Sequence, residues 1–478
     1  MLSTLVKVVG WLIYTPLRYG LPLAVKLGCS GAVWAWRHPR TTATGVPVLT
    51  TVLVAGWQTL AVVLVAAVLA GITWLRIDDE SFDRLVLGFL RTWIRRWAVY
   101  QRRWAFVARR CDLAIQEADS RGNMSFVVPK ITSVTTTEFW DTLLIKMETG
   151  QQVEDFEEAA GRIRTAYRRE RIRVTEQKPG RVRLELMAKD PFKHISVPPT
   201  SIPACLADVD YSAVRVGLTE HLEPWTLSVV GGHTVVSGAP GAGKASIPWN
   251  VLLGLAPAIA AGHVRVHGID PKMMELRQAR DILTSYATTA DATTALLQKL
   301  VEAMDVRKEQ LGEAGERDFV PSAETPLELI LIDELAPLLA YWSRSHRQKI
   351  EDALGLLLTQ GRAPGFIIFG AIQEPTKDIL TVRDLFGRRI GMRLLSQAHT
   401  DAALADDAVE RGALCHRIPE SLAGVSYQLL GDKAEATRAR AGHVQNEDIS
   451  ELVQYVLAHQ EAEVIQLTKN TDDLRGAA

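Results

Sequence analysis

A glycine-rich loop that follows a short apolar strand, Thr234–Val236, constrains the fold of this chain more than any other feature. The loop reads Gly238, Ala239, Pro240, Gly241, Ala242, Gly243 and Lys244. Small residues allow backbone N–H groups to turn inward around a β-phosphate, the following helix presents its positive end, and the lysine reaches the β and γ oxygens. The loop therefore predicts an ATP site on a strand-to-helix turn of an α/β fold.

The residues after the lysine depart from the usual pattern. Serine or threonine normally follows the lysine and supplies a hydroxyl to Mg²⁺. Here Ala245 follows, and Ser246 comes one step later. Either Ser246 replaces the missing hydroxyl, or an acidic residue and water molecules hold the ion. A helix turns by about 100° per residue, which weighs against Ser246.

A second half of the site is predicted at residues 329–334. Four large aliphatic residues precede Asp333 and Glu334, and such a run is typical of a central parallel strand that is buried on both faces. At the carboxyl end of this strand, Asp333 can hold Mg²⁺ directly or through water, and Glu334 can polarise the attacking water. The alternative is an ordinary strand whose acidic residues open a loop.

Two further strands alternate with helical segments. Residues 264–269 end at Asp270, and residues 366–372 end at Gln373. Alternation of this kind predicts a parallel sheet that binds ligands at the carboxyl ends of its strands. We therefore expect Gln373, Asp333 and the phosphate loop to meet at one edge. Gln373 would sense the γ-phosphate or orient water, the alternative being a loop cap.

Composition limits the remaining choices. A chain of 478 residues is long enough for about three domains. The net charge of −1 provides no global attraction to nucleic acid, so any such attraction must be local. The four cysteines are scattered and lack metal-ligand spacing.

The first 76 residues predict a membrane module. Residues 41–75 carry no charge, and a bilayer span needs about 20 apolar residues. Two short spans with a turn at Gly56–Thr59, or one longer helix, both fit this stretch. Arginines flank both of its ends, which places both flanks in the cytoplasm and favours the hairpin. Residues 1–36 are apolar but interrupted by charges, as in a segment that lies along the membrane interface.

A basic amphipathic segment is predicted at residues 77–123. Its aromatic and apolar stripe consists of Trp93, Trp97, Tyr100, Trp104 and Val107. Three arginine pairs recur at seven-residue spacing away from this stripe. A helix in the lipid headgroup layer has this pattern. A helix that packs its stripe on protein and a helix that contacts DNA are the alternatives.

The rest of the chain divides into three parts. Residues 124–203 predict a small α+β domain, with strands near residues 125–128, 143–147, 171–174 and 181–186 and a helix over residues 153–169. The proline-bearing stretch 191–203 is predicted to be a linker. Residues 204–445 predict the nucleotide-binding domain, and residues 446–478 a helix with a polar tail.

Five motifs, in this order, resemble the motor domain of the FtsK/SpoIIIE family: GAPGAGKAS, GIDPKMMEL, LILIDELA, TQGRAPGFIIFGAIQEP and FGRRIGMRL. The resemblance covers about residues 124–445. It implies a RecA-like P-loop ATPase that is anchored in the cell membrane with its ATPase domain in the cytoplasm, forms a homo-hexamer and moves double-stranded DNA. Arg389 and Arg393 match family arginines placed near subunit boundaries, where one of them would act in trans.

The overall build is similar to that of the conjugative DNA-transfer proteins of filamentous actinomycetes, which implies work in conjugation or chromosome partition beside other transfer or division proteins. The tail after the motor domain is too short for the winged-helix module of some family members, so no strong DNA sequence preference is expected. Two alternatives remain open. One is a protein-secretion ATPase of the same family, and the other is a membrane scaffold that binds nucleotide without turnover.

Overall fold

The computed structural model describes residues 62, 65, 66, 68–118, 124–314, 319–376, 379, 381–431 and 435–460. Most of the membrane module predicted at residues 1–76, with its turn at Gly56–Thr59, lies outside these residues, as does the tail from residue 461. Among the described residues, no helix is both long enough and apolar enough to cross a bilayer.

The chain forms two compact units. One comprises the described parts of residues 1–138, 142–163 and 174–184, and the other those of residues 139–141, 164–173 and 185–478. The division passes through a four-stranded sheet with the strand order β3-β4-β6-β5. In chain order, this region contains β1 (Ile115–Ala118), β2 (Met124–Val127), β3 (Lys130–Thr136), β4 (Trp140–Lys146), α7 (Val153–Ala166), β5 (Arg171–Lys178) and β6 (Arg181–Met187).

Each strand predicted between residues 124 and 203 has a counterpart in the structure, and so does the predicted helix. Strands β1 and β3 were not foreseen from the sequence. Because β1 pairs with β2 in an antiparallel hairpin, this hairpin crosses the boundary predicted at residue 124. The end of the predicted basic segment and the start of the predicted α+β domain therefore share one hairpin.

The predicted aromatic stripe divides between two environments. The segment consists of α4 (Asp79–Phe82), α5 (Gly88–Ile94) and α6 (Arg102–Arg110), with π-helical turns at Asp83–Leu87 and Arg95–Gln101. Tyr100, Trp104 and Val107 are buried, and the Trp104 indole donates to the carbonyl of Pro129 at 2.6 Å. Trp93 and Trp97 are instead 56% and 55% exposed. A π turn takes in an additional residue, which rotates the first part of the stripe relative to the second.

On α5 it is the polar face that meets the sheet. The Thr92 hydroxyl lies 2.9 Å from the Thr136 hydroxyl, and Arg95 donates to the carbonyl of Thr137 at 3.1 Å. The apolar side of α5 away from Thr92 is open, and its Leu90, Trp93 and Ile94 are 45%, 56% and 50% exposed. This orientation reverses the usual one, in which a helix turns its apolar side toward the protein core.

A ten-stranded sheet with the order β11-β10-β12-β13-β9-β14-β15-β16-β7-β8 forms the body of the second unit. The strands from β11 to β14 in this order are parallel, and those from β15 to β8 are antiparallel. In chain order they are β7 (Val214–Thr219), β8 (Pro224–Leu227), β9 (Thr234–Ser237), β10 (Val264–Ile269), β11 (Ser285–Ala287), β12 (Leu327–Ile332), β13 (Phe366–Ile372), β14 (Arg388–Gly391), β15 (Val425–Gln428) and β16 (Thr437–Ala441).

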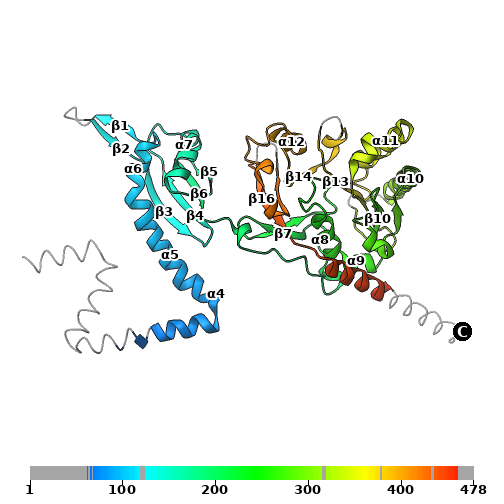
Figure 1. The fold of residues 1–478 in the computed structure, drawn as a ribbon, viewed down its shortest axis with the longest axis horizontal. Helices are drawn as coiled ribbons and strands as arrows, with labels where there is room; N and C mark the ends of the chain where they lie inside the picture. Colours follow the sequence, from blue (N-terminus) through cyan, green and yellow to red (C-terminus); the bar gives the residue numbers. More distant parts are fainter. Residues whose placement is uncertain are drawn as a thin grey trace, which may run out of the picture. The chain divides into compact units, whose positions relative to one another are not determined.

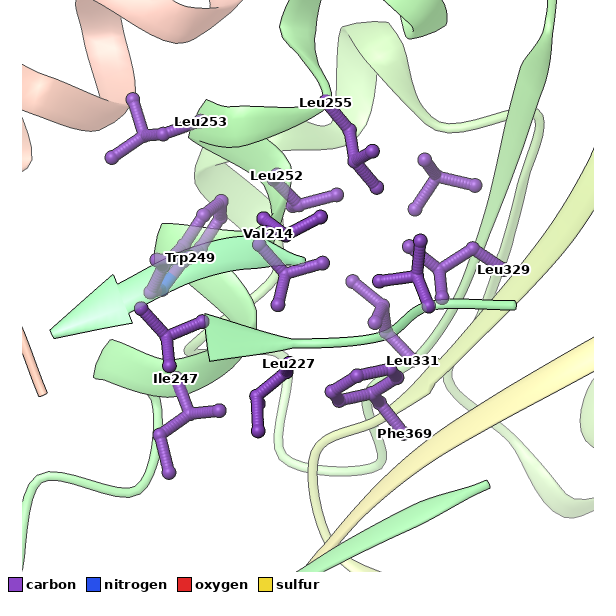
Figure 2. Packing of buried hydrophobic residues seen from close by; sticks show 14 of the residues in the cluster. Val214, Leu227, Ile247, Trp249, Leu252, Leu253, Leu255, Leu329, Leu331 and Phe369 are labelled. Carbon is purple, nitrogen blue, oxygen red and sulfur yellow. The ribbon is translucent and has the colours of Figure 1, made fainter. Parts of the chain in front are cut away.

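Helices cover both faces of the parallel strands (Figure 1). They are α8 (Ser246–Gly254), α9 (Ala256–Ala260), α10 (Ala290–Ala314) and α11 (Arg344–Gln360), while α12 (Gln397–Ala403) lies beside β14 and a last helix spans residues 446–460. Successive β12 residues point to opposite faces. Leu329 and Leu331 join the cluster beneath α8 (Figure 2), whereas Ile330 and Ile332 join the cluster beneath α10 and α11. The predicted parallel sheet with a central strand buried on both faces is thus confirmed.

The stretch predicted to be a linker is packed onto the second unit. Asp190, directly before it, forms a bidentate ion pair with Arg438 of β16, at 2.9 and 2.8 Å, and both side chains are buried. Phe192 is also buried, and the Arg438 guanidinium lies 5.0 Å from its ring centroid. Residues 191–203 therefore form part of the second unit.

A buried polar network holds the amino-terminal end of β12. The carboxylate of Glu328 accepts from Arg307 of α10 at 2.9 Å and lies 2.7 Å from the His267 Nε2 of β10. Burial raises the pKa of Glu328, but the hydrogen bonds and charges of His267 and Arg307 outweigh burial and keep this pKa below its ordinary value. Arg307 also donates to the carbonyls of Pro326 and Pro364, so one guanidinium joins a helix, a strand and two loops.

Replacing Arg307 by methionine should lower the free energy of unfolding by about 3–5 kcal/mol. The buried Glu328 carboxylate would lose its nearest arginine and keep only His267 and the 3.7 Å contact with Arg265. The neighbouring substitution Lys308→Met is the matched control. It removes an ion pair at the surface with Asp305 and should change stability by at most about 0.5 kcal/mol. Denaturant unfolding of both variants tests the network, and equal effects would contradict it.

Candidate nucleotide site

The phosphate loop occupies the turn between β9 and α8. Gly241 and Gly243 have φ angles of 72° and 88°, a region that glycine enters without steric cost. A Cβ on Gly243 would lie 2.8 Å from the amide nitrogen of Gly424. Gly424 N–H donates to the carbonyl of Ala242 at 2.9 Å, so this position needs glycine for close backbone packing as well as for its φ angle.

Other backbone groups of the loop are open to a ligand. In the described part of the chain, the N–H groups of Gly241, Gly243 and Lys244 have no protein acceptor. The amino-terminal end of α8 follows immediately, with Pro248 in its first turn, where a missing N–H costs nothing. Free amides together with a helix terminus form an anion site.

Lys244 lies within this loop and is largely buried. Its ammonium donates to the carbonyls of Gly238 at 2.7 Å and Ala239 at 3.4 Å. Burial lowers its pKa, and the negative charges of Glu334 and Asp333 partly offset that effect. The loop carbonyls compensate the positive charge of the ammonium only in part, and an anionic ligand would compensate it further.

Asp333 and Glu334 follow β12, as predicted, but their environments differ. Glu334 is only 3% exposed. One of its carboxylate oxygens accepts from the backbone N–H of Gln373 at 3.1 Å, and the other accepts from Lys272 at 3.1 Å. Asp333 is half-buried, and its pKa is raised to about 7 by burial first and then by the charges of Asp270 and Glu275.

The loop after β10, which lies within the motif GIDPKMMEL, contributes residues to the site that the sequence had not assigned a role. Asp270 is fully buried, and its Oδ2 accepts from the backbone N–H of Leu276 at 3.1 Å and from the Tyr286 hydroxyl at 3.2 Å. These bonds shape the loop that carries Lys272 and Glu275 to the site. The strand ending at Asp270 was recognised, and its place at the same sheet edge was the signal that these residues belong to the site.

A cavity of about 480 Å³ joins these elements. Its lining comprises Val236, Pro240, Gly241, Gly243, Lys244, Ala245, Pro248, Trp249, Lys272, Met274, Glu275, Leu276, Leu331, Ile332, Asp333, Phe369, Gly370, Ala371 and Gln373. The phosphate loop, Asp333 and Gln373 therefore meet at one edge, as the parallel strands predicted. Glu334 adjoins this cavity through Lys272 and Gln373.

The two predicted arginines have different surroundings. Arg393 donates to the carbonyl of Pro240 in the phosphate loop at 2.6 Å, and its own carbonyl accepts from the N–H of Ala239 at 2.7 Å. Arg389 is half-buried and donates to the exposed carboxylate of Asp384 at 3.1 Å. Arg393 thus holds the phosphate loop of its own chain, whereas the side chain of Arg389 pairs with Asp384, which does not line the cavity.

The donor set fits Mg²⁺ that is held mainly by a nucleotide. Among the described residues, no three His, Cys, Asp or Glu side chains are grouped to hold a metal by themselves. Ala245 lines the cavity, and Ser246 is not among the residues that line it. Mg²⁺ keeps several waters and binds through one or two carboxylates plus substrate phosphates. Two carboxylates line the cavity, Asp333 at the end of β12 and Glu275 on the loop after β10.

The raised pKa of Asp333 makes the stability of the nucleotide-free protein depend on pH. Its folded-state value of about 7 exceeds the ordinary 3.8, so folding favours the neutral acid and stability falls as the pH rises through this window. Asp333→Asn should therefore raise the free energy of unfolding by about 1–3 kcal/mol at pH 8 and by less than half of that at pH 5. Thermal unfolding at the two pH values measures this difference.

The matched control for this prediction is Asp407→Asn, which changes a carboxylate at the surface, outside the cavity. It should shift stability by no more than about 0.5 kcal/mol at either pH. An Asp333→Asn effect that is the same at pH 5 and pH 8 would contradict the assigned pKa.

A parallel sheet with a phosphate loop after one strand and an acidic pair two strands away defines a P-loop nucleotide-binding protein. Residues 212–417 match the model of the FtsK/SpoIIIE family, and residues 83–188 match the model described as "Actinomycete conjugal transfer protein N-terminal domain". The chain therefore carries a domain of the FtsK/SpoIIIE family, and before it a domain of the actinomycete conjugal transfer type.

Curated relatives agree with this assignment. The chain is 24% identical over 263 residues to the DNA translocase FtsK of Halalkalibacterium halodurans, a match that covers 51% of this chain and 32% of that protein. It is 26% identical over 255 residues to the DNA translocase FtsK of Bacillus cereus, covering 48% and 30%. It is 28% identical over 199 residues to the DNA translocase SftA of Bacillus subtilis, covering 38% and 20%. The matched region thus spans a third or less of each relative.

Among solved structures, the pCW3 conjugation coupling protein TcpA, a monomer form with ATPγS, is 17% identical, with a TM-score of 0.46, and the match covers 74% of this chain and 98% of that one. The cytoplasmic domain of the type VII secretion ATPase EccC from Thermomonospora curvata is 19% identical, with a TM-score of 0.41, covering 52% and 31%.

Proposed function

We propose that this protein is an ATP hydrolase that uses Mg²⁺-ATP to move double-stranded DNA, in conjugative transfer or chromosome partition. The observation that carries the proposal is the cavity in which Lys244, Asp333 and Gln373 meet beside the buried Glu334. The family matches support the choice of DNA as substrate, and the relatives described above are DNA translocases.

Each residue of the site has a role in this proposal. The free amides of the phosphate loop and Lys244 bind the phosphates, and Asp333 holds Mg²⁺ through oxygen or water. Glu334 accepts a proton from the attacking water, and Gln373 responds to the γ-phosphate. When bound, Mg²⁺ neutralises charge that develops on the phosphate oxygens.

A homo-hexamer is the proposed assembly, and Arg389 is the arginine that we assign to act in trans. Arg393 is engaged with Pro240 of its own chain, whereas the partner of Arg389 is an exposed aspartate that can exchange for a phosphate of a neighbouring subunit. An arginine in that position stabilises charge in the transition state.

Duplex DNA should stimulate ATP hydrolysis several-fold in the full-length protein, and this effect should weaken steeply with added salt because phosphate contacts release counterions. Single strands and protein cargo should stimulate less. Different duplex sequences should act alike, because contacts to phosphates carry no sequence information. Steady-state turnover with each nucleic acid and with candidate protein cargo tests the assignment.

Glu334→Gln is the control for this experiment. It should bind ATP and lose at least about 100-fold in turnover, because it can no longer accept a proton from water. If only protein cargo stimulates turnover, the result would reject the DNA-translocase assignment and favour a protein-secretion ATPase. ATP binding by the wild type without turnover under any condition would favour the scaffold.

We also propose that the protein is anchored in the cell membrane, with its ATPase domain on the cytoplasmic side. The uncharged residues 41–75 support the anchor. The open face of α5 and of the π-helical turn after it supports a further contact with lipid, because Leu90, Trp93 and Trp97 are exposed beside a helix rich in arginine. Aromatic side chains and arginines suit the headgroup layer of an anionic membrane.

A nitrobenzoxadiazole label on a cysteine that replaces Trp93 should be quenched by lipid-attached nitroxide and protected from iodide. The measurement uses full-length protein in anionic vesicles, with Cys29 and Cys205 replaced by serine. A label that replaces the exposed Arg102 is the control and should be reached by iodide. Iodide quenching of both labels would contradict lipid contact, and protection of position 93 from both quenchers would assign the face to protein.

A further inference from the structure

Both carboxylate oxygens of Glu334 accept hydrogen bonds within the protein. Oε1 accepts from the backbone N–H of Gln373, and Oε2 lies 3.1 Å from the ammonium of Lys272. The side chain is also almost fully buried. The ammonium of Lys272 lowers the basicity of this carboxylate and occupies part of Oε2. Glu334 therefore becomes a stronger proton acceptor for an attacking water when one of the two contacts opens.

The two contacts differ in their freedom to open. The Gln373 N–H belongs to backbone that directly follows β13, and this strand is hydrogen-bonded to β12 and β9 on its two sides. Lys272 projects from a loop, and its side chain is 42% exposed. Four flexible methylenes separate its ammonium from the backbone. The bond at Oε2 is therefore the one that can be released without disturbing the sheet.

The cavity offers Lys272 another partner. Lys272 and Lys244 both line it, with Asp333 and Gln373. A triphosphate brings several negative charges into the same space, and hydrogen bonds from ammonium to phosphate are among the strong charge-assisted ones. A single carboxylate competes poorly with that charge at a similar distance.

We propose that Lys272 is a positioning residue that holds Glu334 inactive until a triphosphate binds. In the absence of nucleotide, Lys272 pairs with Oε2 of Glu334. When the γ-phosphate enters the cavity, Lys272 moves to it and leaves Oε2 free for the attacking water. A diphosphate does not draw Lys272 away, so Glu334 becomes available only when a bond remains to be hydrolysed. This inference rests on the proposed ATPase function.

The test measures binding rather than hydrolysis and uses the full-length protein with Mg²⁺. Dissociation constants for ATPγS and ADP are compared among the wild type, Glu334→Gln, Lys272→Met and the double variant. Glu334→Gln should tighten ATPγS by about 3- to 10-fold, because Lys272 no longer leaves an ion pair, and should leave ADP unchanged. In the Lys272→Met background, the same glutamine should produce no gain.

Lys272→Met should itself weaken ATPγS by about 10-fold with little effect on ADP, since the lost contact is with the γ-phosphate. Lys272→Arg keeps the charge and should restore most of the preference for ATPγS. In turnover, Lys272→Met should raise the KM for ATP and also lower kcat, whereas a side chain that only stabilises the loop would affect ATPγS and ADP equally.

Two results would overturn the inference while leaving the ATPase assignment intact. One is a gain from Glu334→Gln that is the same with and without Lys272. The other is an equal loss of ATPγS and ADP affinity in Lys272→Met. Failure of the wild type to bind ATPγS at all would instead reject the proposed function, and the inference with it.

Discussion

The common direction of β9, β12 and β13 is the constraint on which the site depends. These strands are adjacent and parallel, so their carboxyl ends lie at one edge of the sheet. Hydrophobic clusters on both faces hold their register. A slip of β12 by one residue would exchange its two buried faces and move Asp333 by about 3.3 Å along the strand. Packing far from the cavity therefore determines the geometry within it.

The carboxylates gathered at this edge of the sheet repel one another and destabilise the folded protein. Asp333, Glu334, Asp270 and Glu275 lie close enough to influence one another, and burial together with this like charge raises the pKa of Asp333. Lys272 reduces this repulsion by forming an ion pair with Glu334. Functional sites often keep such groups at a cost in stability, and a bound cation would offset the negative charge that the folded chain leaves uncompensated.

The helix that precedes the small sheet shows how one amphipathic pattern serves two environments. From Tyr100 onward its stripe packs on protein, whereas Phe89, Trp93 and Trp97 remain open. The polar face of α5 meets the sheet through Thr92 and Arg95. Periodicity identifies an apolar face but not the medium that it meets, and the π-helical turn between the two parts changes the direction of the stripe.

The residues themselves determined the class of fold and the core of the site. The phosphate loop, the aliphatic run before Asp333 and the strand before Gln373 are local patterns whose chemistry follows from neighbouring residues, so each was recognisable in the chain. The roles of Lys272, Asp270 and Arg393 were decided only by tertiary structure. Each depends on a partner distant in sequence, as Lys272 does on Glu334 and Arg393 on Pro240. A single sequence carries no record of such pairings, because they arise only when separate strands reach the same edge of the sheet.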